Sequence, residues 1–163
     1  MSTNTHSSQA GDVVDVRGPR FVAWATTGVL VLVLIAAAFS TGTATVLIAL
    51  QALVFGAGAA LGPRHHPYGR IYAALVAPRL GPVTETEPVA PLRFAQLLGL
   101  VFAAMSLLGF AFGATLAGAV FAGFALFAAL LNAAFGICLG CQLYPLVTRL
   151  RAGHPHAGTP VTN

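Results

Sequence analysis

The chain contains only two cysteines, Cys138 and Cys141, and they lie three positions apart, with Gly136 before them and Gly140 between them. On a helix this spacing places two thiols on one face, close enough to form a disulfide or to hold one soft metal ion. The alternative is that both are small apolar side chains packed in the protein interior. The spacing and the neighbouring glycines favour a functional thiol pair.

The position of the cysteines relative to a helix end determines how reactive they are. The long apolar run before them predicts that they lie at a helix C-terminus, where the helix dipole disfavours a thiolate. Arg93 is expected at a similar depth, and a guanidinium near the sulfurs would offset this effect. A helix break at Gly136 or Gly140, followed by a new helix beginning at Cys138, would reverse it.

Three amides are the main polar side chains within the apolar segments: Gln51, Gln96 and Asn132. An unpaired amide in hydrocarbon is costly, so each is expected to face another helix and form hydrogen bonds there. No ionisable residue lies deep within these segments. This absence argues against a proton-coupled transporter or a charge-lined ion channel.

No metal site or cofactor is expected from the sequence. The weaker alternative is a metal bound by Cys138 and Cys141 with His65 or His66, which lie in the loop between the two halves of the chain. Adjacent histidines beside an arginine are more often part of a polar surface loop, so this alternative ranks below a redox or sulfur-transfer role.

The composition excludes an ordinary soluble domain. Of the 163 residues, 57% are hydrophobic and 7% are charged, and lysine is absent. A soluble domain carries about a quarter charged residues. There is no charge between Arg20 and Arg64 or between Arg93 and Arg149. Each of these stretches is long enough to cross a bilayer of about 30 Å twice.

The sequence therefore predicts an all-α membrane protein, a four-helix transmembrane bundle made of two hairpins. A weak internal repeat relates the hairpins, since Arg-Phe opens each and Phe-Gly occurs near the end of each. The membrane domain is expected over residues 14–152, between a disordered leader (1–13) and a disordered tail (153–163). The spans are predicted at 21–39, 44–61, 94–112 and 117–141, and the loop 63–92 should contain a short helix in the membrane interface.

The arginines predict the orientation. All eight lie before the first span, in the central loop or after the last span, and the two short hairpin turns carry none. The positive-inside rule then places both termini and the central loop in the cytoplasm. A cleaved signal peptide is the competing interpretation of the first span, but that span is longer than a signal-peptide core. No basic stripe indicates nucleic-acid binding, so lipid is the expected partner of the arginines.

Pairs of glycines spaced by four occur at Gly58 and Gly62, Gly109 and Gly113, and Gly136 and Gly140. This spacing predicts close packing of helix backbones.

The sequence resembles a bacterial family of integral membrane proteins known as domain of unknown function 4395. The resemblance covers about residues 14–150, and the matching segments are 14–21, 78–80, 87–88, 91–96 (with the motif Arg-Phe-Ala-Gln) and 135–141 (with Cys-Leu-Gly-Cys). It implies a multi-pass protein of the bacterial plasma membrane and association with a thioredoxin-like or sulfurtransferase protein. No catalytic residues can be carried over from the family.

Two functions remain open at this point. The first is a thiol/disulfide or sulfur-relay protein that uses Cys138 and Cys141 on the cytoplasmic side, with its status as an enzyme undecided. The second is a non-catalytic membrane assembly component or small transport subunit, whose cysteines only pack. A homodimer is possible in either case, because four short helices rich in small residues can pack alone or in pairs.

Overall fold

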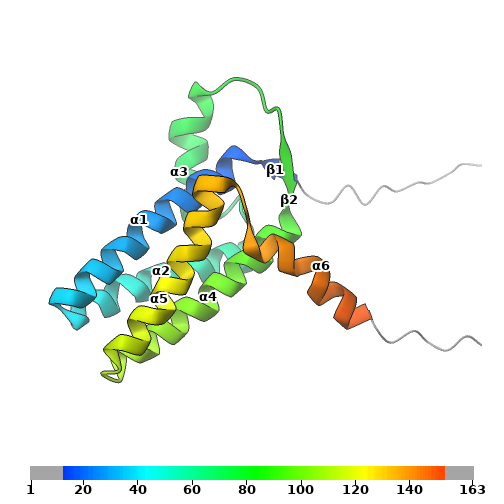
Figure 1. Ribbon diagram of the computed structural model, residues 1–163. Coiled ribbons are helices and arrows are strands. Elements are labelled where there is room, and N and C mark those ends of the chain that lie inside the picture. Colours follow the sequence, from blue (N-terminus) through cyan, green and yellow to red (C-terminus); the bar gives the residue numbers. More distant parts are fainter. Residues whose placement is uncertain (1–12, 153–163) are drawn as a thin grey trace, which may run out of the picture.

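The computed structural model describes residues 13–152 and confirms the four-span bundle (Figure 1). The spans are α1 (Arg17–Phe39), α2 (Thr41–Leu61), α4 (Val89–Ala111) and α5 (Thr115–Phe135). Each has 21 or 23 residues and no more than two charges in its apolar window. That length crosses a hydrocarbon layer of about 30 Å. The predicted leader and tail lie outside the described residues, apart from Val13.

The first and third spans begin earlier than predicted, at Arg17 rather than 21 and at Val89 rather than 94. Each contains a proline in its first turn, Pro19 or Pro91, where the missing backbone N–H would have no partner in any case. The arginines taken as helix boundaries, Arg20 and Arg93, are therefore the fourth residue of α1 and the fifth residue of α4, within or just after the first turns. Their long side chains can extend from these turns toward the polar end of the molecule.

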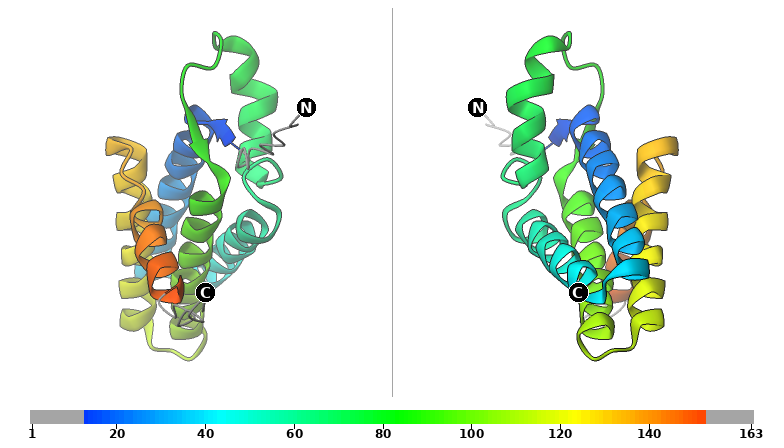
Figure 2. Two further views of the ribbon diagram at one scale, coloured as in Figure 1. Left: turned by 90° about the vertical axis from the view of Figure 1, so that its right-hand side faces the viewer. Right: turned by 90° about the vertical axis from the view of Figure 1, so that its left-hand side faces the viewer.

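The four spans pack in a ring, in which α1 contacts α2, α2 contacts α4, α4 contacts α5 and α5 contacts α1 (Figure 2). Small residues fill much of the interior, including Ala44, Ala103 and Ala122, with Leu30, Ile48 and Phe55 between them. Large apolar side chains such as Leu53 and Phe124 face outward. In water this exposed apolar surface would be unfavourable, whereas in a bilayer it contacts lipid.

The α4–α5 hairpin shows how the glycine pairs act. A Cβ on Gly109 would lie 2.5 Å from the backbone nitrogen of Gly118, so only glycine permits this approach. Nearby, the buried Ser106 Oγ donates to the Gly118 carbonyl at 2.7 Å. Gly113, by contrast, has a positive φ and lies in the turn. In this pair Gly109 allows the close packing of α4 against α5, and Gly113 lies in the turn that follows α4.

The segment between α2 and α4 is helical first and extended afterwards. α3 (Pro67–Ile71), the π-helical turn η1 (Tyr72–Val76) and the 3₁₀ turn η2 (Ala77–Arg79) follow one another without a gap. This confirms a helix in the predicted loop. Tyr72 anchors it against α1, with its ring centroid 5.7 Å from that of Phe21.

A two-stranded antiparallel sheet was not predicted. β1 (Val13–Asp15) pairs with β2 (Thr86–Pro88), with Val14 opposite Glu87. The Arg17 guanidinium donates to the carbonyls of Gly81 and Pro82, both at 3.1 Å. The sheet thus joins the segments that lead into α1 and α4 and holds the two hairpins together at one end. Residue 13 belongs to this sheet and not to a leader.

The fourth span is shorter than predicted. α5 ends at Phe135, and a separate helix, α6 (Leu139–Ala152), packs against the start of α4 and extends outward from the bundle (Figure 1). The prediction of one helix over 117–141 was wrong, because Gly136 is the only helix-breaking residue in the apolar segment 135–138 and a continuing helix was equally compatible with that composition.

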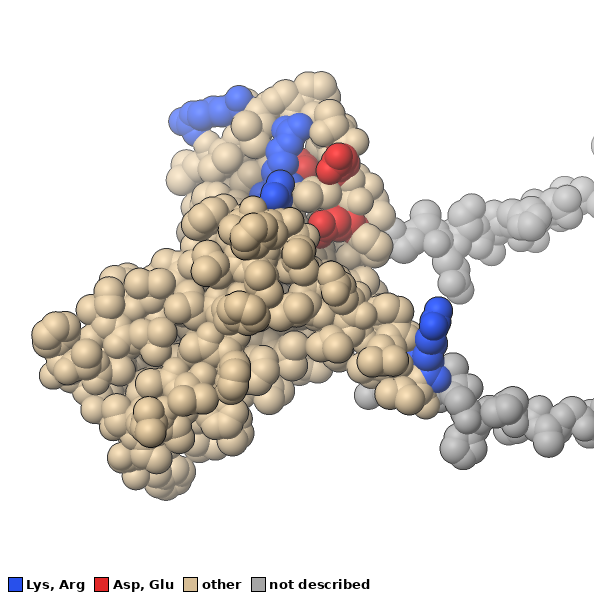
Figure 3. Space-filling model, viewed as in Figure 1, with Lys and Arg blue, Asp and Glu red and all other residues tan. Residues whose placement is uncertain are grey.

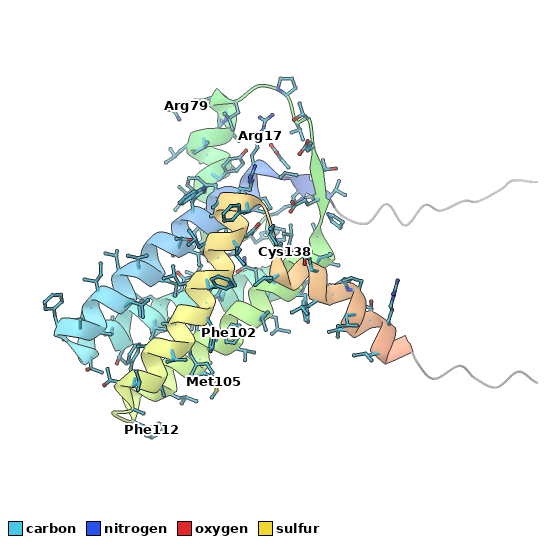
Figure 4. All side chains as sticks on the ribbon, in the orientation of Figure 1. Arg17, Arg79, Phe102, Met105, Phe112 and Cys138 are labelled. Carbon is cyan, nitrogen blue, oxygen red and sulfur yellow. A yellow bond between two sulfur atoms is a disulfide. The ribbon has the colours of Figure 1, made fainter. Side chains whose placement is uncertain are left out.

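Charged residues gather at one end of the molecule. On the face shown in Figure 3, they lie around α3, the β1–β2 sheet and α6, while the body of the spans carries none. Cys138 is at this charged end, where α5 passes into α6 (Figure 4), and Cys141 is joined to it by a disulfide.

Candidate functional site

The chain changes direction at Gly136, immediately before the cysteines. Gly136 adopts a left-handed conformation with φ of 69°, and its N–H donates to the Asn132 carbonyl at 3.1 Å. This is the αL type of helix ending, which glycine adopts without the steric penalty of a Cβ. The sequence allowed a helix break at Gly136 or at Gly140, and in the structure the break is at Gly136. It separates the cysteines from the C-terminus of α5.

Cys138 caps the N-terminus of α6. Its carbonyl accepts the first helical hydrogen bond, from the Gln142 N–H at 3.1 Å. Its Sγ accepts a hydrogen bond from the Cys141 N–H at 3.3 Å, as an N-cap side chain does. The helix dipole and an N–H therefore both favour negative charge on this sulfur. The unfavourable helix end expected from the sequence is replaced by a favourable one.

Cys138 and Cys141 are joined by a disulfide, with their Cα atoms 5.1 Å apart. They lie within one helical turn, as predicted. The turn is the first of α6 and not the last of the fourth span.

The start of α4 holds α6 in place. A Cβ on Gly140 would lie 2.5 Å from the Cα of Ala95, so the two backbones are in close contact between the cysteines. One turn further along α6, the Tyr144 ring packs edge-on against Phe94, with centroids 6.0 Å apart. The Arg-Phe-Ala-Gln segment of α4 and the Cys-Leu-Gly-Cys segment of α6 therefore form one interface.

Arg93 makes its hydrogen bonds elsewhere. Its guanidinium donates to the carbonyls of Ala59 and Ala60 in the last turn of α2, at 2.9 and 2.8 Å. Cations stabilise helix C-termini in this way. Its role as a thiol-activating group stays a prediction.

A different guanidinium lies beside the motif. A Cβ on Gly136 would be 3.4 Å from an Arg20 guanidinium nitrogen. Arg20 also interacts with Glu87 of β2: burial raises the pKa of this carboxyl, and the positive charge of Arg20 opposes that rise. Arg20 lies near the start of α1 in the same Arg-Phe pair that Arg93 forms near the start of α4, so the sequence contained a signal that could have identified Arg20.

A cavity of about 340 Å³ extends from Cys138 into the bundle and is lined mainly by residues of α1, α4 and α5. Cys138 lines it, whereas Cys141 does not. Its walls are mainly apolar and include three aromatic rings, those of Phe55, Tyr72 and Phe102. Figure 4 shows Cys138 at the α5–α6 bend and Phe102 further along the bundle.

The three amide side chains that were predicted to form hydrogen bonds between helices differ in their surroundings. Gln51 is buried, and its Oε1 accepts a hydrogen bond from the Tyr68 hydroxyl at 2.9 Å. Gln96 and Asn132 both line the cavity. The Gln96 Oε1 is buried without a hydrogen-bond partner among the described residues. An inter-element hydrogen bond is thus present for Gln51, but its partner is in α3 and not in another span.

His66 is the functional candidate that sequence reasoning underestimated. It is 1% exposed and lines the cavity, and neither ring nitrogen has a hydrogen bond of good geometry within residues 13–152. Burial lowers the pKa of His66, and the neighbouring Gln96 side chain opposes this shift. Gly58 accommodates both side chains, since a Cβ there would lie 2.5 Å from the His66 ring and 3.0 Å from Gln96.

The metal alternative gains no support from the geometry. Within the described part of the chain, no three His, Cys, Asp or Glu side chains come together as metal ligands. His65 and His66 do not join the cysteines in such a group.

Comparison with known proteins identifies a family. Residues 14–149 match the model of a family described as a domain of unknown function (DUF4395). No curated protein and no solved structure matches the chain.

Proposed function

The chain belongs to the DUF4395 family, and we propose that it is a membrane thiol–disulfide exchange protein in which Cys138 and Cys141 alternate between disulfide and dithiol. The observation that carries this proposal is the hydrogen bond from the Cys141 N–H to the Cys138 sulfur at the start of α6. It gives the two sulfurs different chemistry. A pair that served only to fill space would not require this arrangement.

The arrangement favours one direction of attack. A thiolate of a partner protein attacks the Cys141 sulfur, and the disulfide breaks with its electron pair on Cys138. Cys138 is the better leaving group, because the helix N-terminus and the Cys141 N–H stabilise its thiolate. A second partner thiol then attacks the mixed disulfide and releases Cys141. The partner leaves as a disulfide, and the membrane protein holds two more electrons and two protons.

The partner we propose is a thioredoxin-like protein of the bacterial cytoplasm. Its supporting observation is the charge distribution, because the arginines and the cysteines share one end of the bundle. The positive-inside rule assigns that end to the cytoplasmic side of the plasma membrane. Dithiols of the thioredoxin class are abundant there and exchange through mixed disulfides.

Trapping tests the proposal. The oxidised full-length protein is mixed with a bacterial thioredoxin whose second active-site cysteine is replaced by serine, so that a mixed disulfide cannot be released. We expect a covalent adduct at Cys141, located by peptide mass spectrometry, and none with the Cys138→Ser/Cys141→Ser variant. Absence of the adduct, together with a disulfide that intact reduced thioredoxin fails to reduce, would overturn the proposal.

A further inference from the structure

The cavity beside Cys138 has the properties of a ligand site. Its volume of about 340 Å³ exceeds the roughly 150 Å³ of an apolar cavity that binds benzene. It therefore admits a six-membered ring with several substituents. The rings of Phe55, Tyr72 and Phe102 line it and offer flat apolar surfaces against which such a ring can pack.

Two buried side chains of this lining, His66 and Gln96, have polar atoms without a hydrogen bond of good geometry among the described residues. His66 is 1% exposed and lies beside the Gln96 side chain, but neither of its ring nitrogens has a hydrogen bond of good geometry among the described residues. The Gln96 Oε1 is likewise buried without a hydrogen-bond partner among the described residues. Buried polar groups are normally hydrogen-bonded, so two such groups in one cavity indicate that a bound molecule supplies the missing bonds.

These groups specify the polar part of the ligand. A neutral imidazole offers one N–H donor and one acceptor nitrogen, and the Gln96 Oε1 is a second acceptor. The ligand must thus accept one hydrogen bond and, in at least one of its states, donate another. The two fully charged residues of the lining, Asp15 and Arg64, have opposite signs, which favours a ligand with no net charge.

We propose that this cavity binds a lipid-soluble quinone, which accepts the electrons of the Cys138–Cys141 dithiol. The proposal rests on the thiol-exchange function given above and names its second substrate. A quinone carbonyl accepts from the His66 N–H, and the quinol hydroxyl formed on reduction donates to Gln96 Oε1. Both the quinone and the quinol therefore form a hydrogen bond with the protein, and the apolar part of the molecule contacts the apolar side chains that line the cavity.

The electron transfer balances without a further reactant. The two thiols lose two electrons and two protons, and a bond forms between the Cys138 and Cys141 sulfurs. The two carbonyl oxygens of the quinone take up the two protons, and the ring takes up the two electrons. Cys138 is the sulfur that faces the ligand, because it lines the cavity.

The first test measures binding without thiol chemistry. Decylubiquinone is chosen because its fully substituted ring does not add free thiols. It is titrated into the full-length Cys138→Ser/Cys141→Ser variant in nanodiscs, and binding is followed by quenching of Trp24 fluorescence and by thermal stabilisation. We expect saturable binding with one molecule per chain. His66→Ala and Ala129→Phe should each weaken it at least tenfold, the first by removing a polar partner and the second by filling the space.

The second test follows the reaction. The reduced wild-type protein is mixed with decylubiquinone under anaerobic conditions, and we expect one quinol for each disulfide formed. Gln96→Leu should slow this at least tenfold, while Gly123→Ala, which places a methyl group in open space, should leave the rate unchanged.

The outcomes separate the two proposals. If thioredoxin reduces the disulfide but decylubiquinone neither binds nor oxidises the dithiol, the quinone proposal is wrong and the exchange function stands. Equal quinone reduction in the wild type and in the Gln96→Leu and Ala129→Phe proteins would also overturn the quinone proposal, because the reaction would then occur outside the cavity. If decylubiquinone binds but the cysteines take part in no thiol exchange, the proposed exchange function is wrong, and the cavity is a ligand site without redox chemistry.

Discussion

At the scale of single residues, the most informative finding is the difference between the two sulfurs. Cys138 precedes the first turn of α6 and accepts a hydrogen bond from the Cys141 N–H, while Cys141 is within the turn. The backbone N–H groups at a helix start point toward an anion placed before it. One sulfur of the pair is therefore stabilised as a thiolate, and the other is not.

This difference predicts unequal alkylation. After reduction, Cys138 in the Cys141→Ser variant should react with iodoacetamide at pH 7 about ten times faster than Cys141 in the Cys138→Ser variant. Serine retains the N-cap and the backbone N–H in both, so each variant keeps the helix start. Mass spectrometry of quenched samples gives the rates. Equal rates, or a faster Cys141, would contradict the assigned roles.

His66 predicts a pH dependence of stability. Burial lowers its pKa below the ordinary value of about 6.5, so the folded state binds its proton less readily than the unfolded state does. Its contribution is complete above that value and is lost as the pH falls toward the lower folded-state pKa. The wild type should thus lose thermal stability between pH 7.5 and 5.5.

The matched variant is His66→Gln, which keeps a polar side chain of similar length but does not titrate. Its melting temperature in detergent should fall less than that of the wild type over the same pH range. If the two proteins lose stability in parallel, the protonation of other groups causes the loss, and the interpretation of His66 as a buried neutral imidazole is wrong.

At the scale of elements, α6 depends on its contact with α4. Gly140 leaves no room for a Cβ, since Ala95 backbone atoms would lie within 2.5 and 3.0 Å of it. Apart from this contact and the Phe94–Tyr144 ring pair, α6 exposes a row of leucines at helical spacing, Leu143, Leu146 and Leu150. Such a row is suited to the membrane interface, but it does not determine where α6 lies along α4. The glycine contact therefore sets where the cysteines lie.

Gly140→Val should displace α6 from α4. The expected results are a melting temperature several degrees lower and a Cys138 alkylation rate closer to that of Cys141, because the sulfur no longer has a fixed environment. Gly123→Ala is the control, since a Cβ there meets nothing within 4 Å. It should be neutral or slightly stabilising, because alanine favours a helix. A Gly140→Val protein as stable as this control would show that the α4–α6 contact does not position α6.

The sequence predicted the elements whose signals are strong. The charge-free apolar runs identified four spans, and the helical spacing of Ile71, Tyr72, Leu75 and Val76 identified the helix in the loop. The end of α5 could not be predicted, because Gly136 lies in an apolar segment where a continuing helix is equally compatible with the composition. The β1–β2 sheet was missed for a different reason: its strands are only three residues long, and each depends on a partner far along the chain.

The candidate site was predictable only in part. The spacing of Cys138 and Cys141 pointed to the pair, but a prediction of their neighbours required the position of each helix around its axis. Arg93 and Arg20 lie near the starts of α4 and α1 in the same Arg-Phe dipeptide, and depth alone could not show which one approaches the cysteines. His66 was assigned to a polar loop because its neighbours are polar, whereas the chain folds it inward over Gly58.

At the scale of the whole molecule, polarity is arranged along the bundle axis. The arginines of the described residues lie in the first turns of α1 and α4, in the α2–α4 segment and in α6, while the α1–α2 and α4–α5 turns carry no charge. The uncharged turns instead expose aromatic rings, with Phe39 86% and Phe112 82% exposed. Aromatic side chains at that end are suited to a membrane–water boundary. The cavity opens into the bundle from the opposite, charged end.

This asymmetry predicts the orientation in the membrane. In a Cys138→Ser/Cys141→Ser background, Ser40→Cys in the α1–α2 turn should react with a membrane-impermeant maleimide added to intact cells. Arg79→Cys at the end of the η2 turn should react only after the cells are made permeable, because the seven remaining arginines at its end of the bundle hold that end in the cytoplasm. Labelling is detected as a mass shift on a gel. Accessibility of Arg79→Cys from outside would reverse the orientation, and the exchange partner would then have to be sought among extracytoplasmic thiol proteins and not in the cytoplasm.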